Sequence, residues 1–180
     1  MFSRKIIVLA AGALLTAGAA AGQVAANAEG NGAGACTVTG SVTSSGIGLT
    51  PSNNTFTFNS VAITCTGSDS DDNGAWTVNT VAGSTGDQNE TCAGATNIKA
   101  SLTGSGPEGL LTGALDSSTS HRAGANVIVN GTITAGGEVH TFHGHLIFQP
   151  TNGVCDPASG STAPTTTANI ITGSTAAVTE

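Results

Sequence analysis

The sequence predicts an all-β fold, a single antiparallel β-sandwich held by two disulfides, and three observations lead to this class. Charged residues make up only 8% of the 180 residues, against about 25% in a typical globular domain, so the Glu, Lys and Arg that helical bundles need are scarce. Apolar residues alternate with Thr and Ser in several short segments, which is the pattern of half-buried strands. Gly, Asn, Asp and Pro separate these segments, and four cysteines supply the cross-links.

The N-terminal residues have the features of a secretory signal peptide. Two basic residues precede an apolar run over 6–21, and Ala26-Asn27-Ala28 fits the small-x-small rule for cleavage. The run is shorter than the roughly 20 residues that a membrane-spanning helix needs. We therefore expect cleavage of 1–28 and secretion from a bacterial cell, with no membrane anchor on the mature chain. A flexible segment over 29–35 should precede a single domain over 36–180.

The first expected strand, over 36–43, places Cys36 on its apolar face. Every second residue of this segment is apolar or Gly, and the residues between them are Thr or Ser. Cys65 lies on the apolar face of the next segment, and inward-facing cysteines on successive strands favour a Cys36–Cys65 disulfide. Cys92 and Cys155 then pair by elimination. Their bridge closes a loop of about 60 residues, for which the chain-entropy estimate is roughly 4 kcal/mol.

Further strands follow from the same alternation, and their turns are marked by Gly, Asn and Pro. Asn59-Ser60 separates two apolar faces of opposite parity, which predicts a bulge or a change of sheet. Asn73-Gly74 and Ala135-Gly136-Gly137 are expected hairpin turns of type I′. Residues 157–165 are expected to form a loop. The expected strands after the first lie over 55–66, 75–82, 96–104, 109–115, 126–134, 138–149 and 166–172.

A tryptophan follows the second cysteine in the position that a β-sandwich core would place it. Cys65 followed by Trp76 resembles the immunoglobulin pattern of a cysteine on one strand and a core tryptophan on the next. The later cysteine of that pattern is absent, and a tyrosine corner is impossible because the chain has no Tyr. The resemblance therefore implies an Ig-like, Greek-key sandwich in general architecture only, with Trp76 in the core.

Three of the four histidines are close together in one expected strand. His143 and His145 project from the same face, and two imidazoles at this spacing offer two of the ligands that Zn²⁺ or Cu²⁺ requires. The sequence identifies no third ligand, so the alternative is a solvent-facing strand surface. His140 projects with Phe142 on the apolar face, and we expect it to be hydrogen-bonded at the strand entrance.

A second candidate metal site is an acidic turn that matches the first half of a calcium-binding loop. Asp69, Asp71 and Asn73 supply oxygen atoms at alternate positions, and Gly occupies the sixth position. The twelfth position is Thr80 where a calcium loop has a bidentate Glu. The alternative is a polar hairpin tip, and a weak Ca²⁺ or Zn²⁺ site is the only cofactor that the sequence indicates.

The charge balance and the absence of catalytic motifs limit the function classes. After loss of the leader, only Lys99 and Arg122 would balance 11 acidic residues, so binding to nucleic acid or anionic lipid is not expected. No nucleophile elbow or zinc-protease motif occurs. We therefore expect a non-catalytic structural, surface-associated or binding role with a protein or small-molecule partner. The alternatives are a small metal-dependent enzyme using His143 and His145, and a secreted inhibitor or small-ligand carrier.

Overall fold

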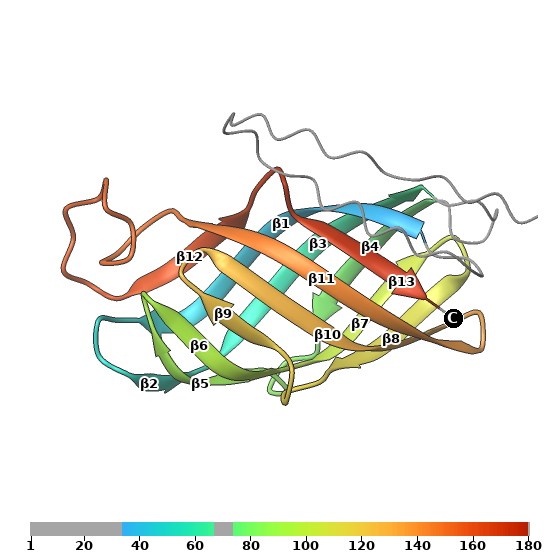
Figure 1. The fold of residues 1–180 in the computed structure, drawn as a ribbon, viewed down its shortest axis with the longest axis horizontal. Helices are drawn as coiled ribbons and strands as arrows, with labels where there is room; N and C mark the ends of the chain where they lie inside the picture. The colour runs from blue at the N-terminus through green and yellow to red at the C-terminus, as the bar shows by residue number, and fades with distance from the viewer. Residues whose placement is uncertain (1–33, 67–73, 180) are drawn as a thin grey trace, which may run out of the picture.

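The computed structural model of the chain describes residues 34–66 and 74–179, which form one antiparallel sheet (Figure 1). The described residues contain no helix, and so none that is long and apolar enough to cross a membrane. The strands are β1 (Gly34–Ile47), β2 (Ser52–Asn54), β3 (Phe56–Thr66), β4 (Gly74–Thr80), β5 (Gly86–Thr91), β6 (Gly94–Lys99), β7 (Ser101–Gly106), β8 (Gly109–Leu115), β9 (His121–Ala123), β10 (Asn126–Ala135), β11 (Glu138–Pro150), β12 (Thr165–Ile170) and β13 (Thr175–Thr179).

The sheet closes on itself, so its inner face is surrounded by strands. The order β1-β3-β4-β7-β8-β10-β11 continues through β12 and β13, which both pair with β11 and with β1. Ala176 of β13, for example, pairs with Gly144 of β11 on one side and with Cys36 of β1 on the other. The opposing layers therefore belong to one continuous sheet, and the predicted all-β, antiparallel class with two disulfides is confirmed.

A branch of short strands extends the sheet at one end. The first part of β10 pairs with β9, and the order continues from β9 through β6 and β5 to β2. The loop after β11 is attached to this branch by the Cys92–Cys155 disulfide. At the opposite end of the long strands, Cys36 and Cys65 are register partners and form the other disulfide. Both predicted disulfide pairings are confirmed.

The hydrophobic core lies on the inner face, where the alternation of the sequence places the apolar residues. The parity switch in β3 is a bulge, because Ser60 and Val61 together lie opposite Gly40 of β1. This extra residue lets Phe58 and Val61 both face inward. The hairpin turn Gly136-Gly137 joins β10 to β11 as predicted, and both glycines have positive φ angles.

The predicted strands differ from the observed ones mainly in short polar segments. Four strands were not expected: β2, β5, β9 and β13. The strand expected over 96–104 is two strands, which separate at Ala100. β3 and β4 pair as the predicted hairpin requires, whereas Asn73 of its turn, the leader over 1–28 and most of the segment 29–35 lie outside the described residues.

Candidate functional site

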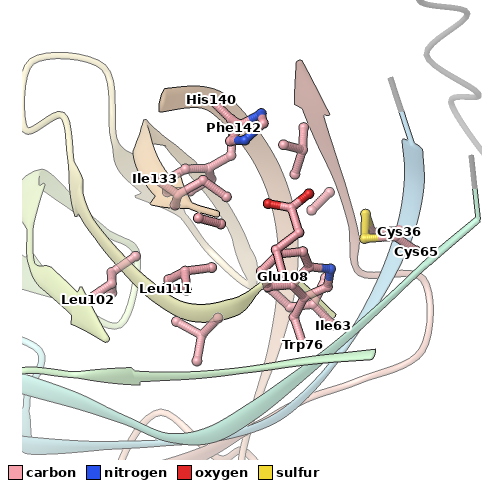
Figure 2. Close-up of a pocket in the computed structure, with 14 residues that line it drawn as sticks. Cys36, Ile63, Cys65, Trp76, Leu102, Glu108, Leu111, Ile133, His140 and Phe142 are labelled. Carbon is pink, nitrogen blue, oxygen red and sulfur yellow. A yellow bond between two sulfur atoms is a disulfide. The ribbon is translucent and has the colours of Figure 1, made fainter. Parts of the chain in front are cut away.

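A cavity of about 80 Å³ lies inside the closed sheet, at the end where the β7–β8 and β10–β11 turns are found. Its wall is apolar except for two residues, Glu108 and His140. The Cys36–Cys65 disulfide forms part of the wall (Figure 2). The cavity is therefore a mainly hydrophobic space with two polar groups, which is the usual composition of a small-molecule site.

The wall residues come from eight strands and one turn, and the alternation along each strand directs their side chains inward. His140 and Phe142 of β11, two residues apart, both line the cavity, and so do Trp76 and Val78 of β4. Side chains at this spacing share one face of a strand. The same property that predicts strands in the sequence therefore also brings these residues together around one space.

Three large wall residues each lie over a glycine of the neighbouring strand: Trp76 over Gly106, Phe142 over Gly131, and Ile133 over Gly113. A Cβ atom at Gly106 would lie 2.0 Å from the indole ring of Trp76, and one at Gly131 would lie 2.7 Å from the Phe142 ring. The large side chains therefore occupy the space above the neighbouring strand.

His140 is the buried polar residue of the wall. It is only 6% exposed, and its Nδ1 atom has no hydrogen-bond partner among the described residues. The sequence correctly placed it on the apolar face with Phe142, but the hydrogen bond expected at the strand entrance is not made by this nitrogen. A buried nitrogen without a partner costs free energy on the order of 1–3 kcal/mol, so a hydrogen bond from a molecule in the cavity would stabilise this position.

Glu108 brings a carboxylate to the same cavity. It occupies the two-residue turn Pro107-Glu108, and Figure 2 shows its side chain extending into the space among the wall residues. A Cβ at Gly136 would lie 3.0 Å from Glu108 Oε2, so the carboxylate lies beside the β10–β11 turn. Among the described residues the only ion pair joins Arg122 to Glu90, so Glu108 has no cation of its own.

The sequence predicted Trp76 in the core. In the structure it is half-buried and lines the cavity, outside the buried core cluster. The reason is Gly106, whose missing side chain gives the indole a place near the end of the sheet. The residue is the only tryptophan of the chain, and there is no tyrosine. Its fluorescence is therefore a direct report on the cavity.

The two histidines of the predicted metal site lie on the outer side of β11. His143 Nδ1 contacts Asn130 Oδ1, and His145 Nε2 lies 2.9 Å from Asn126 Oδ1. In the described part of the chain, no three His, Cys, Asp or Glu side chains gather as a metal site requires. The predicted calcium ligands lie outside the described residues: Asp69, Asp71 and Asn73.

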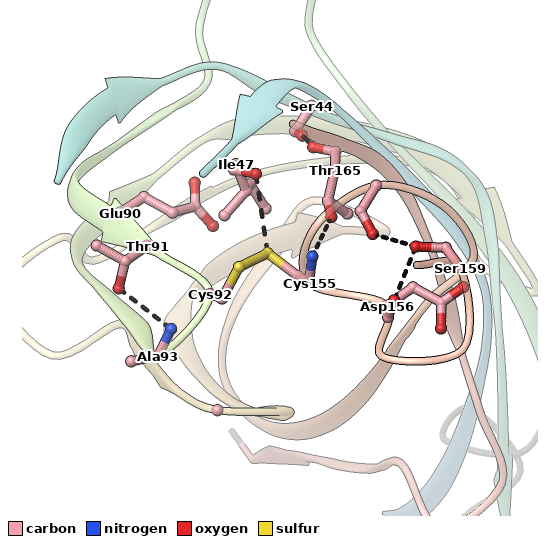
Figure 3. The surroundings of a disulfide bond; sticks show 12 residues. Ser44, Ile47, Glu90, Thr91, Cys92, Ala93, Cys155, Asp156, Ser159 and Thr165 are labelled. Carbon is pink, nitrogen blue, oxygen red and sulfur yellow. Dashed lines mark hydrogen bonds between the residues drawn. A yellow bond between two sulfur atoms is a disulfide. The ribbon is translucent and has the colours of Figure 1, made fainter. Parts of the chain in front are cut away.

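A buried charge cluster lies at the opposite end of the sheet, in the branch of short strands. Glu90 of β5 is 3% exposed, and its Oε1 atom lies 3.0 Å from the Arg122 guanidinium of β9. Arg122 also donates hydrogen bonds to three backbone carbonyls: those of Thr91, Cys92 and Gly124. The nearby Cys92–Cys155 disulfide is held in turn by a hydrogen bond that the backbone N–H of Cys155 donates to the Thr165 hydroxyl (Figure 3). This cluster therefore ties strands and loops together.

The electrostatics of this cluster favour a protonated Glu90. Burial raises the pKa of the Glu90 carboxyl, and the neighbouring carboxyl of Asp87 raises it further; Arg122 opposes both effects, and the resulting pKa is about 8. Asp87 itself accepts a hydrogen bond from the backbone N–H of Asn54. The adjoining cavity measures only about 40 Å³. The arrangement thus fits a structural cluster better than a ligand site.

Three of the residues that define these two ends could not be identified from the sequence. Glu108 lies between two expected strands, and Glu90 and Arg122 lie in segments without apolar alternation. No local signal distinguishes such residues from solvated ones, because their positions depend on strand pairing. Comparisons of the chain with protein-family models, curated proteins and solved structures found no match.

Proposed function

We propose that the protein is a non-catalytic binding module that holds a small, mainly apolar ligand in the cavity beside Trp76. The observation that carries the proposal is an apolar cavity of about 80 Å³ with a buried, unpartnered nitrogen of His140 in its wall. Among the alternatives that the sequence leaves open, this proposal corresponds to the small-ligand carrier. The two disulfides are compatible with an extracellular site of action.

The energetics of an empty cavity support this proposal. Protein interiors are normally packed as densely as organic crystals. The lining of this 80 Å³ space therefore lacks dispersion contacts on one side. A ligand that fills the space recovers the missing contacts. Small-molecule pockets usually measure roughly 300–1,000 Å³, so we expect a ligand that is small or inserts only one end.

The proposal can be tested with a series of linear alcohols and the fluorescence of Trp76. The chain is titrated with 1-butanol, 1-pentanol and 1-hexanol, and the change in emission gives each Kd. Each buried methylene contributes about 0.8 kcal/mol, so affinity should rise about fourfold per carbon until the cavity is full. Emission that does not change, or affinity that does not depend on chain length, would contradict the proposal.

A matched pair of variants on β13 locates the binding space. Ala176 lines the cavity, whereas the next residue, Ala177, does not and is paired with His143 on the outer side of β11. Ala176→Leu adds three carbon atoms at the wall and should weaken 1-hexanol binding at least about tenfold. Ala177→Leu, with the same added volume, should leave it unchanged. Equal effects of the two substitutions would place binding elsewhere.

A further inference from the structure

We propose that the ligand is a small apolar amine, whose ammonium group binds between the Glu108 carboxylate and the Nδ1 atom of His140. This inference rests on the proposed binding function and adds the chemical class of the ligand. Both residues line the cavity that Trp76 borders: Glu108 lies in the β7–β8 turn, and His140 is buried near the start of β11. They divide the site into a polar end and an apolar body.

The two polar groups match a hydrogen-bond donor. The Glu108 carboxylate only accepts hydrogen bonds, and the Nδ1 atom of a neutral His140 accepts one when Nε2 carries the proton. An alkylammonium group has three N–H donors and no acceptor, so it can satisfy both residues at once. An alcohol has a single donor and can satisfy only one of them. The head group that the wall fits best is therefore an ammonium.

The charge distribution around the cavity also selects a cation. The described residues contain two basic side chains of the Lys and Arg type, Lys99 and Arg122, and neither lines this cavity. Arg122 is paired with Glu90 in the other charge cluster. The whole chain carries a net charge of −7. A ligand carboxylate would face Glu108 with no cation nearby, whereas an ammonium supplies the counter-charge that Glu108 lacks.

The aromatic wall residues contribute to the same preference. The rings of Trp76 and Phe142 border the cavity, each held against a glycine of the next strand. The face of an aromatic ring attracts a cation within about 6 Å of its centre, and tryptophan is the strongest of the aromatic residues in this respect. The remaining wall is aliphatic apart from the Cys36–Cys65 disulfide, so the amine needs a short hydrocarbon body.

Three ligands with the same six-carbon chain test the inference on the intact protein. Hexylammonium, 1-hexanol and hexanoate are titrated separately at neutral pH, with Trp76 emission as the readout. We expect hexylammonium to bind at least about tenfold more tightly than 1-hexanol, and hexanoate more weakly than both. In Glu108→Gln, the ratio of hexylammonium to hexanol affinity should fall to within about twofold of one. Glu138→Gln removes an exposed carboxylate at the neighbouring turn and should keep the wild-type ratio.

The outcomes separate this inference from the function on which it rests. If 1-hexanol binds and hexylammonium binds no better, the amine is wrong and the apolar cavity stands. If hexanoate binds most tightly, the cavity selects anions and the inference is overturned. If none of the three binds, the proposed function itself fails. Should Glu108→Gln not fold, added salt provides the second test, because it should weaken hexylammonium binding to the wild-type protein and spare hexanol.

Discussion

Raising the pH should destabilise the protein through one buried carboxyl group, that of Glu90. Burial and the neighbouring Asp87 raise its pKa from 4.5 to about 8 in the folded state. Between these two values, the folded protein keeps a proton that the unfolded chain has released. The unfolded state then binds fewer protons, so the free energy of unfolding must fall as the pH rises. Below pH 4.5 both states are protonated, and this effect disappears.

The size of the effect follows from the shift. One pKa unit corresponds to about 1.4 kcal/mol, so the accumulated loss for Glu90 reaches a few kcal/mol near pH 8. A typical domain has a total stability of about 5–15 kcal/mol, so the loss is measurable. Asp116 does not interfere, because hydrogen bonds from Ser118 lower the pKa of its carboxyl from 3.8. The contribution of Asp116 to stability is lost only as the pH falls below 3.8.

Urea unfolding of the wild-type protein and Glu90→Gln at pH 5, 6, 7 and 8 measures this contribution. The amide resembles the protonated acid and does not titrate, so Glu90→Gln should become progressively more stable than the wild-type protein as the pH rises. Glu138→Gln, at an exposed position, should follow the wild-type curve. A stability difference between wild type and Glu90→Gln that is independent of pH would refute the reasoning.

Three other substitutions test the structural roles assigned above. Gly106→Ala places a methyl group where the Trp76 ring lies, so the tryptophan emission should shift and 1-hexanol affinity should fall in fluorescence titrations. Replacing Cys92 and Cys155 together by Ser opens a loop with a sequence separation of 63, and urea unfolding should show a loss of about 4 kcal/mol. Arg122→Met removes the hydrogen bonds that the guanidinium donates to Glu90 and to three backbone carbonyls, and the same measurement should show a loss on the order of 1–3 kcal/mol for each buried acceptor left unpaired.

The long strands and the first disulfide were predictable because alternation is a local property of the chain. A strand with one buried face must repeat every two residues, so Cys36 and Cys65 could be placed on inward faces without knowledge of the fold. The bulge in β3 was visible for the same reason, as a change of parity between Phe58 and Val61. These features needed no information about which strands are neighbours.

The polar strand β5 could not be predicted in this way. Its inward residues include Asp87 and Glu90, which are buried despite their charge. Hydrophobic periodicity cannot reveal a strand whose buried positions are acidic. Their burial is possible because Arg122 arrives from a strand about 30 residues further along the chain. Pairing of this kind is a property of the folded structure.

The cavity could not be predicted from the sequence for a related reason. Sequence analysis assigned glycine mainly to the turns between strands, whereas Gly106, Gly113 and Gly131 lie within strands. A glycine in a strand often marks a close approach of another group. Which group approaches depends on register, as in the direct pairing of Gly131 with Phe142. The open space beside the rings therefore follows from tertiary structure.

The two ends of the sheet differ in how their inward polar groups are compensated. At one end, Glu90 Oε1 has the guanidinium of Arg122, while Glu90 Oε2 and Arg122 Nε are buried without a hydrogen-bond partner among the described residues. At the other end, the buried Nδ1 atom of His140 has no hydrogen-bond partner, and the half-buried Glu108 has no ionic partner, among the described residues. Burying a polar group without a partner costs free energy, and at the Glu90 end the Arg122 guanidinium offsets part of this cost. The cavity beside Glu108 and His140 measures about 80 Å³, against about 40 Å³ for the one beside Glu90 and Arg122, so it offers more space for a partner from outside the chain.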